Sequence, residues 1–247
     1  MMTSINTLTE QGPHRKNNED AICHGFNHAL QVCWMIVADG MGGHKAGEVA
    51  SNLLTDYVNA QLTTLTEKPN QGWQNYASQI IKEANRNIYD KAQQCSQYEG
   101  MGTTGVVAIF DADSCYIAWV GDSRAYLLHQ EELIQLTEDH TMIQFLLNKG
   151  AITASTAENS NTKNLLSRAL GSKADVEVDA VSSHINSGDV FMLSTDGLHD
   201  FLSESDIKQF LVEYTNKEVN TDVCSKMVAQ AVLQSSKDNL TLGLICI

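Results

Sequence analysis

The stretch Val37-Ala38-Asp39-Gly40-Met41-Gly42-Gly43-His44 is the part of this chain that most strongly predicts its fold and chemistry. It closes an apolar run that begins at Val32 and has the composition of a buried strand. The run ends in a carboxylate, Asp39, followed by three glycines within four positions. We expect the glycines to let the backbone fold back, so that a main-chain carbonyl faces the same point as the carboxylate. Oxygen ligands on such a rigid frame favour Mg²⁺ or Mn²⁺, although a simple tight turn after a core strand has the same local sequence.

Outside this stretch, groups of predicted strands alternate with predicted helices, and in two places the helices come as a pair. Strand composition is found at residues 3–9, 21–26, 105–110, 115–121, 125–129, 132–136, 176–184, 190–194 and 240–247. Apolar residues recur at helical spacing over residues 47–65, 73–95, 139–149, 205–214 and 221–236. This order lacks the regular alternation of a parallel sheet. It predicts an α+β fold in which two antiparallel sheets pack together with helices on the outside.

The 247 residues contain no Pro-rich linker, charge block or internal repeat, so we expect a single domain over residues 1–247. Within it, the small polar residues 153–164 predict a surface excursion. The formal net charge of −14 argues against nucleic acid or an anionic membrane as a partner. Six cysteines without a Cys-x-x-Cys pair indicate free thiols in a reducing compartment. No signal peptide and no apolar run of about 20 residues are visible, so we expect a soluble, cytoplasmic protein.

Several acidic residues share one setting at or beside a predicted strand end. The pairs are Asp39-Gly40, Gly121-Asp122, Asp196-Gly197 and Asp238-Asn239, with Glu19-Asp20 just before a strand. Any one pair is typical of a turn, and Asp122 has Arg124 as a nearby ion-pair partner. Together they are unusual, because converging carboxylates repel one another unless cations neutralise them. Two cations about 3.5–4 Å apart can share one carboxylate and activate a bridging water.

Arg15 lies four residues before Glu19 in a predicted loop. Its guanidinium has the geometry to clamp a phosphate beside bound cations, and the alternative is a solvated loop arginine. The chain has no clear Ser-His-Asp or reactive-Cys motif, as expected if a metal-activated water attacks the substrate.

Six motifs occur in order along the chain. They are Arg15-x-x-Asn18-Glu19-Asp20, residues 37–44, Met101-Gly102-Thr103-Thr104, Val120-Gly121-Asp122-Ser123-Arg124, Ser194-Thr195-Asp196-Gly197-Leu198 and Lys237-Asp238-Asn239-Leu240-Thr241. This set resembles the metal-dependent Ser/Thr protein phosphatases of the 2C type (the PPM family) in their compact bacterial form. The resemblance extends from about residue 6 to residue 247. Each motif alone is weak evidence, and the specificity comes from six in order.

The resemblance implies a four-layer α-β-β-α sandwich, with two antiparallel β-sheets flanked by pairs of helices. A flap subdomain at about residues 137–171 would lie near the metal site. The implied activity is hydrolysis of phosphoserine and phosphothreonine in proteins by a hydroxide that bridges two divalent cations, Mn²⁺ or Mg²⁺. A weaker third cation is implied by bacterial relatives. The implied partners are phosphorylated proteins and a cognate Ser/Thr kinase that the enzyme opposes, and we expect a monomer.

The resemblance also assigns residues to roles. Asp39 would bridge the two metals, the Gly40 carbonyl would complete one site, and Asp196 and Asp238 would complete the other. Glu19 and Asp20 would hold metal-bound waters or bind directly. Asp122, together with Asp196, would form the third site, and Arg15 would bind the substrate phosphate.

The chain departs from eukaryotic members at Met41, where they place a histidine proposed as general acid. A metal-bound water would then protonate the leaving group, and His44 is a second, weaker candidate. Two alternatives remain open. One is a pseudophosphatase that binds phosphoproteins without turnover, although no metal carboxylate is missing. The other keeps the chemistry but acts on a small phosphorylated molecule or on another phosphoresidue.

Overall fold

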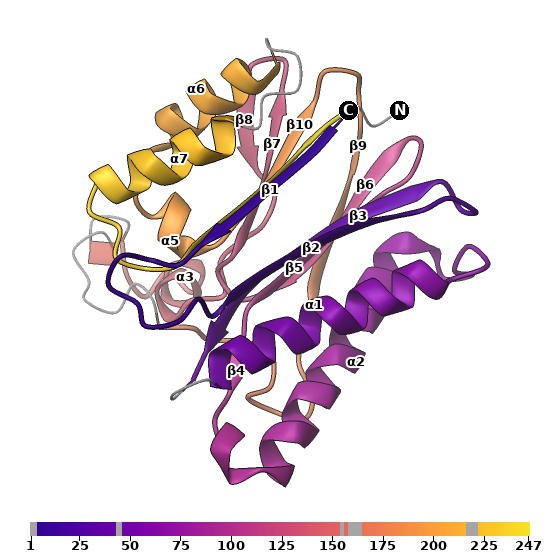
Figure 1. Ribbon diagram of the computed structural model, residues 1–247, viewed down its shortest axis with the longest axis vertical. Coiled ribbons are helices and arrows are strands. Elements are labelled where there is room, and N and C mark those ends of the chain that lie inside the picture. Colours follow the sequence, from indigo (N-terminus) through magenta and orange to yellow (C-terminus); the bar gives the residue numbers. More distant parts are fainter. Residues whose placement is uncertain (1–3, 43–45, 154–155, 158–164, 216–221) are drawn as a thin grey trace.

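The computed structural model describes residues 4–42, 46–153, 156–157, 165–215 and 222–247. Two antiparallel sheets stack at the centre of the molecule, and helices cover both outer faces (Figure 1). The predicted α+β sandwich of two sheets flanked by helices is thereby confirmed. The expected excursion at residues 153–164 lies largely outside the described residues, and His44 lies entirely outside them.

The first sheet has the strand order β1-β11-β10-β7-β8. Its strands are β1 (Ser4–Glu10), β11 (Leu240–Cys246), β10 (Val190–Ser194), β7 (Arg124–His129) and β8 (Glu132–Gln135). The second sheet has the order β2-β3-β5-β6-β9. It consists of β2 (Asp20–Asn27), β3 (Val32–Met41), β5 (Gly105–Phe110), β6 (Ser114–Val120) and β9 (Asp179–His184), and the short β4 (Gly102–Thr103) pairs with the end of β3.

Two helix pairs cover the sheets on opposite sides of the sandwich (Figure 1). Helices α1 (Ala46–Thr64) and α2 (Gly72–Gln94) pack on the second sheet. Helices α6 (Glu204–Thr215) and α7 (Asp222–Leu233) pack on the first. Shorter helices are the 3₁₀ turn η1 (Ser96–Tyr98), α3 (Met142–Asn148) and α5 (Asp196–His199). None of the helices in the described parts of the chain combines the length and apolar composition needed to cross a bilayer.

Strand β3 is apolar from Val32 to Ala38 because both of its faces are buried there. Trp34 and Ile36 pack toward α1 and α2, whereas Met35 and Val37 pack toward the first sheet. Successive side chains of a strand point to opposite faces, so a strand between two hydrophobic layers must be apolar at every position. This double burial makes β3 a rigid support for the acidic residue near its end.

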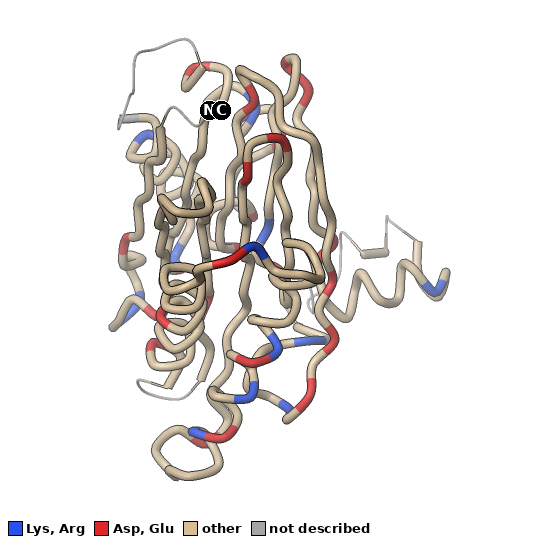
Figure 2. Tube along the Cα trace, turned by 90° about the vertical axis from the view of Figure 1, so that its right-hand side faces the viewer, with Lys and Arg blue, Asp and Glu red and all other residues tan. Residues whose placement is uncertain are grey.

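Lys and Arg positions are scattered among the more numerous Asp and Glu positions along the described chain (Figure 2). The chain has 16 basic and 30 acidic residues.

Three details differ from the prediction. The strand around Asp39 continues to Met41, because β4 pairs with Gly40 and Met41. The helix expected at residues 139–149 begins at Met142, where the Thr141 hydroxyl accepts a hydrogen bond from the Gln144 N–H at 3.1 Å. Residues 176–178 precede β9 instead of belonging to it.

Gly40 is required for close approach and does not form a turn. A Cβ atom at Gly40 would lie 2.2 Å from the Gly47 carbonyl oxygen and 2.5 Å from that of Glu19. The glycine therefore lets the end of β3 contact both the start of α1 and Glu19, the residue before β2. Of the glycines that the structure describes in this stretch, only Gly42 has a positive φ, +153°, as the predicted fold-back requires.

Gly40→Ala should therefore destabilise the metal-free protein by about 1–3 kcal/mol, because backbone atoms must move to admit the methyl group. Urea unfolding in the presence of chelator measures this. Gly188→Asn is the matched control, since Gly188 has φ +92° and open space around it, and Asn tolerates that backbone conformation. Equal midpoints for Gly40→Ala and the unaltered protein would contradict the close-approach explanation.

Candidate active site

The predicted acidic residues meet at one end of the sandwich. Asp20 and Asp39 lie directly opposite each other in the β2–β3 pair. Side chains at directly opposed positions share one face of the sheet and lie close together. Asp196 begins α5 immediately after β10, and Asp238 lies two residues before β11, so both come from the first sheet. Asp122 lies in the short connection between β6 and β7.

These carboxylates raise one another's pKa. Burial is the largest cause at each position, and neighbouring carboxylates add to it. The pKa of Asp39 is raised well above its ordinary value, and those of Asp20, Asp122 and Asp196 rise to about 7, about 8 and about 6. Asp39 keeps some contact with solvent because it lines an open cleft, but the surrounding protein still removes most of its water. A group of acids held in this way has a strong electrostatic preference for cations.

The residues present fit hard divalent cations. Glu19 Oε1 is buried without a hydrogen-bond partner among the described residues, and such an oxygen is available to a cation or its water. The donor set is entirely oxygen, as Mg²⁺ and Mn²⁺ prefer. No three His, Cys, Asp or Glu side chains of the described chain already surround a single ion position.

Thr104 holds Asp39 in place, and sequence reasoning assigned it no role. The Asp39 N–H donates to the Thr104 hydroxyl at 2.9 Å, and the Thr104 N–H donates to the Asp39 carbonyl at 2.8 Å. The same hydroxyl lies 2.6 Å from that of Ser123, the residue after Asp122. The Met101–Thr104 motif was the signal for this residue, which links the Asp39 backbone to the side chain of Ser123, next to Asp122.

Arg15 contributes the positive charge of the site. It forms an ion pair with Asp238, and its side chain is 46% exposed. A guanidinium has five N–H donors, so one ion pair leaves others for a phosphate. The structure therefore brings Arg15 to the acids, as predicted, with Asp238 as its present partner.

A cleft of about 590 Å³ lies over these residues. One wall carries Arg15, Glu19, Asp39, Asp196 and Asp238, and the other is formed by residues 165–169. A second cavity of about 360 Å³ continues from Asp122 and Asp196 toward Asp139 and Asp200. The two cavities share Asp122 and Asp196, so these carboxylates separate a main chamber from a side chamber.

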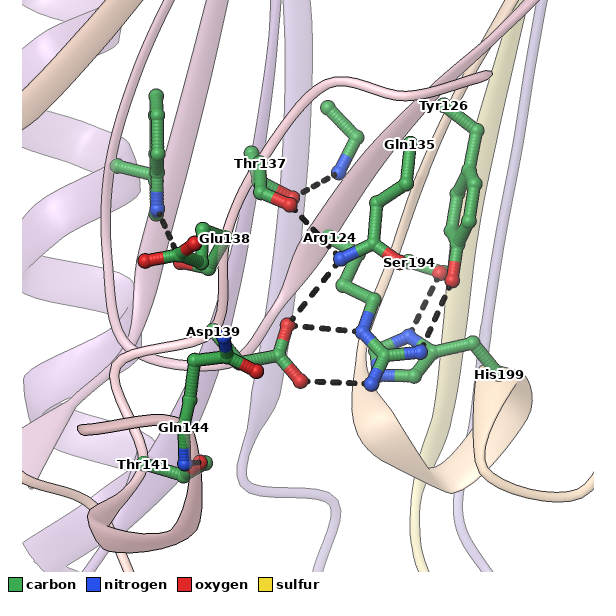
Figure 3. A network of polar contacts seen from close by, with 12 residues as sticks. Arg124, Tyr126, Gln135, Thr137, Glu138, Asp139, Thr141, Gln144, Ser194 and His199 are labelled. Carbon is green, nitrogen blue, oxygen red and sulfur yellow. Dashed lines mark hydrogen bonds and ion pairs between the residues drawn. The ribbon is translucent and has the colours of Figure 1, made fainter. Parts of the chain in front are cut away.

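The alternative interpretation of Asp122, an ion pair with Arg124, is not what the structure shows. Arg124 instead makes a two-pronged ion pair with Asp139, with Nε 2.8 Å from Oδ1 and Nη2 2.6 Å from Oδ2 (Figure 3). Its Nη1 donates to the Tyr126 hydroxyl at 3.1 Å. Asp122 therefore remains free of a cationic partner among the described residues, which suits a carboxylate facing a cation.

The shifted carboxylate pKa values predict how the metal-free protein responds to pH. The folded protein retains protons on Asp20, Asp122 and Asp196 that the unfolded chain releases near the ordinary pKa of 3.8. Because the folded pKa is the higher one, the stabilisation is complete below about pH 4 and is lost as pH rises through about 6 to 8. Thermal unfolding with chelator should therefore give a Tm that falls over this range. Mn²⁺ should reverse the fall, because it replaces the protons. A Tm that rises from pH 5 to pH 8 with chelator would contradict the carboxylate crowding.

Comparison with known proteins agrees with this site. The sequence model of the family Protein phosphatase 2C matches residues 14–233. The serine/threonine phosphatase stp of Listeria innocua is 36% identical over 243 residues, which cover 96% of this chain and 93% of that protein. The solved serine/threonine phosphatase of S. agalactiae has a TM-score of 0.92 at 31% identity and covers 100% of both chains. The catalytic domain of the serine threonine protein phosphatase PstP, solved in complex with two manganese ions, has a TM-score of 0.83 at 29% identity over 99% of this chain and 98% of that one. This chain belongs to the protein phosphatase 2C family.

Proposed function

We propose that this protein is a metal-dependent phosphatase that hydrolyses phosphoserine and phosphothreonine in proteins. The observation that carries the proposal is the meeting of Asp39, Asp196 and Asp238 with Arg15 in one cleft, with Asp20 opposite Asp39 in the sheet. The relatives named as serine/threonine phosphatases support the substrate class. The oxygen-rich donor set supports two divalent cations, with Mn²⁺ favoured by the two manganese ions bound to PstP.

When bound, the cations supply an activated water and neutralise charge on the phosphate. Asp39 would hold both of them, the Gly40 carbonyl would be a further ligand of one cation, and Asp196 and Asp238 would be further ligands of the other. Asp20 and Glu19 hold their waters or bind directly. Arg15 binds the substrate phosphate after exchanging part of its contact with Asp238, and Asp122 with Asp196 holds a third cation at the mouth of the side chamber.

The cysteines support attack by water. Burial raises the pKa of Cys33 and Cys224 to about 12 and that of Cys115 well above its ordinary value. Thiols that stay protonated at neutral pH are poor nucleophiles. None of the described cysteines lines the main cleft. A cysteinyl-phosphate route therefore has no support in the described parts of the chain.

We further infer that residues 137–171 form a flap subdomain over the cleft within one domain of residues 1–247. Its support is that Leu165–Ala169 form the wall opposite the acids. By analogy with bacterial relatives, we propose that the protein acts as a cytoplasmic monomer on phosphoproteins and opposes a Ser/Thr kinase.

Hydrolysis of p-nitrophenyl phosphate and of matched phosphothreonine and phosphotyrosine peptides tests the proposal. We expect turnover with Mn²⁺, less with Mg²⁺, none with EDTA, and a preference for the phosphothreonine peptide. Asp122→Ala should mainly raise the Mn²⁺ concentration needed for half-maximal rate. A folded, Mn²⁺-loaded sample without turnover would refute the proposal and favour a module that binds phosphoproteins. A preference for phosphotyrosine would refute the substrate class alone.

A further inference from the structure

His140 lies buried beside the cleft, and the proposed reaction assigns it no part. Its side chain is 5% exposed, and its ring stacks on Trp119 with 6.0 Å between centroids and an interplanar angle of 18°. Its main-chain N–H donates to the Gly121 carbonyl at 2.9 Å, and its carbonyl accepts from the Ser167 N–H at 2.8 Å. A buried histidine with every main-chain group bonded is held in one orientation.

The contacts of the ring assign its tautomer. The Gly121 N–H donates to Nδ1 at 3.1 Å, so Nδ1 carries no proton. Nε2 then carries the proton and donates it to Asp179 Oδ2 at 3.1 Å. Arg168 Nη1, 3.3 Å from Nε2, is a second donor to the same carboxylate, with 2.9 Å to Asp179 Oδ1. Burial and Arg168 lower the pKa of His140, which agrees with a neutral ring.

On one side, His140 holds the turn that aims Asp122. Gly121 has φ +106°, and a Cβ there would lie 2.6 Å from the Thr104 side chain. Two hydrogen bonds with His140 fix this glycine: its N–H donates to Nδ1 of His140, and its carbonyl accepts from the main-chain N–H of His140. The Asp122 carboxylate makes no ion pair or hydrogen bond to another side chain within the described residues. Its direction is therefore set by the backbone that His140 holds.

On the other side, His140 holds the opposite wall of the cleft. Its carbonyl binds Ser167, and Asp179 links its ring to Arg168. Both Ser167 and Arg168 line the main chamber. One buried ring thus connects the acidic wall to the wall at residues 165–169.

We propose that His140 is a positioning residue, which orients Asp122 through the Gly121 backbone and thereby sets the affinity of the cation beside Asp122. The inference rests on the proposed function only in taking divalent cations as the ligands of the cleft. It predicts that the acceptor at Nδ1 matters more for cation affinity than the donor at Nε2.

Two substitutions separate these ring atoms. In His140→Asn, the amide oxygen can take the place of Nδ1 as acceptor for the Gly121 N–H but cannot reach Asp179. In His140→Gln, the amide can reach Asp179 but loses the acceptor at the δ position. Calorimetric titration with Mn²⁺ should show the weakest site of His140→Gln about 10- to 100-fold weaker, and that of His140→Asn within about threefold of the unaltered protein.

A double-mutant cycle tests whether His140 acts through Asp122. In an Asp122→Asn background, His140→Gln should cause no further loss of Mn²⁺ affinity. Equal losses in His140→Asn and His140→Gln, or an undiminished loss in the Asp122→Asn background, would overturn the proposal. His129 is the matched control, because it pairs with Asp189 at 2.7 Å at the far end of β7, and His129→Gln should leave Mn²⁺ binding unchanged.

A measurement on the unaltered protein covers the case in which His140→Gln does not fold. Imidazole ¹⁵N shifts of the chelated protein should show the Nε2–H tautomer of His140 from pH 5.5 to pH 8. The Nδ1–H tautomer, or a protonated ring at neutral pH, would overturn the proposal. An unaltered protein that binds no Mn²⁺ would refute the proposed function, whereas intact Mn²⁺ binding together with the Nδ1–H tautomer would overturn the present inference alone.

Discussion

Asp39→Asn should lower kcat for p-nitrophenyl phosphate by more than about 100-fold while leaving the protein folded. The substitution keeps the size of the side chain and one carbonyl oxygen, but it removes the charge that the cations need. Asp39 lies opposite Asp20 in the sheet and is surrounded by three further carboxylates, those of Asp122, Asp196 and Asp238. Asp39 thus has carboxylates of both sheets around it, so the loss should exceed that at any single neighbouring position.

The same substitution should not weaken the metal-free protein. Removing a charge from a crowd of like charges relieves repulsion, so the Tm of Asp39→Asn with chelator should equal or exceed that of the unaltered protein. Adding Mn²⁺ should raise the Tm of Asp39→Asn less than that of the unaltered protein. Binding to the folded state stabilises by mass action, and the variant has lost a charge that the cations need. Asp56→Asn, on the exposed side of α1, is the control and should change neither quantity. Full activity of Asp39→Asn would refute the site.

Asp139→Asn should lower the free energy of unfolding by about 2–4 kcal/mol. This loss is smaller than the full cost of breaking a buried ion pair, because the side chains of both partners keep some contact with solvent. The side chains of Arg124 and Asp139 are 23% and 16% exposed, and both oxygens of the carboxylate are engaged. The variant leaves a mostly buried guanidinium with a neutral partner. Tm should fall by roughly 4–16 °C in a chain of this size.

Urea unfolding in the presence of chelator measures this effect apart from any change in cation binding. Asp90→Asn is the matched control, since it breaks an exposed pair with Arg86 on α2, with side chains 44% and 56% exposed. That control should cost less than about 0.5 kcal/mol. Similar losses in Asp139→Asn and Asp90→Asn would show that the Arg124–Asp139 pair contributes no more than a surface contact.

Much of the fold could be predicted because its main elements have strong local signals. The uninterrupted apolar run of β3 reflects burial on both faces, and the helical spacing over α1 and α2 reflects one buried stripe on each. Elements of two to four residues, β4 and α5, were missed, since they are too short to show a period. The candidate site residues came from the order of short motifs, and the structure brings those residues to one cleft.

Residue pairing across the chain is where local sequence was misleading. The sequence offered Asp122, two residues away, as a possible partner of Arg124, but Arg124 pairs with Asp139. The β7–β8 register explains this, because Tyr126 lies opposite Gln135, and Leu136 donates to Ala125 at 2.8 Å. The chain that follows β8 therefore runs past Arg124 and brings Asp139 to it.

The sequence by itself determined the strands, the long helices, the family and the acidic residue types, because each depends on local composition or on short ordered motifs. The tertiary structure alone decided which carboxylates share a cleft, which residue neutralises Arg124, and how His140 connects Asp122 to the opposite wall. Those relations join residues as far apart as Asp20 and Asp238, and they exist because stacking the two sheets brings their strand ends together. Separation along the chain carries no information about such contacts, whereas strand register and sheet packing specify them.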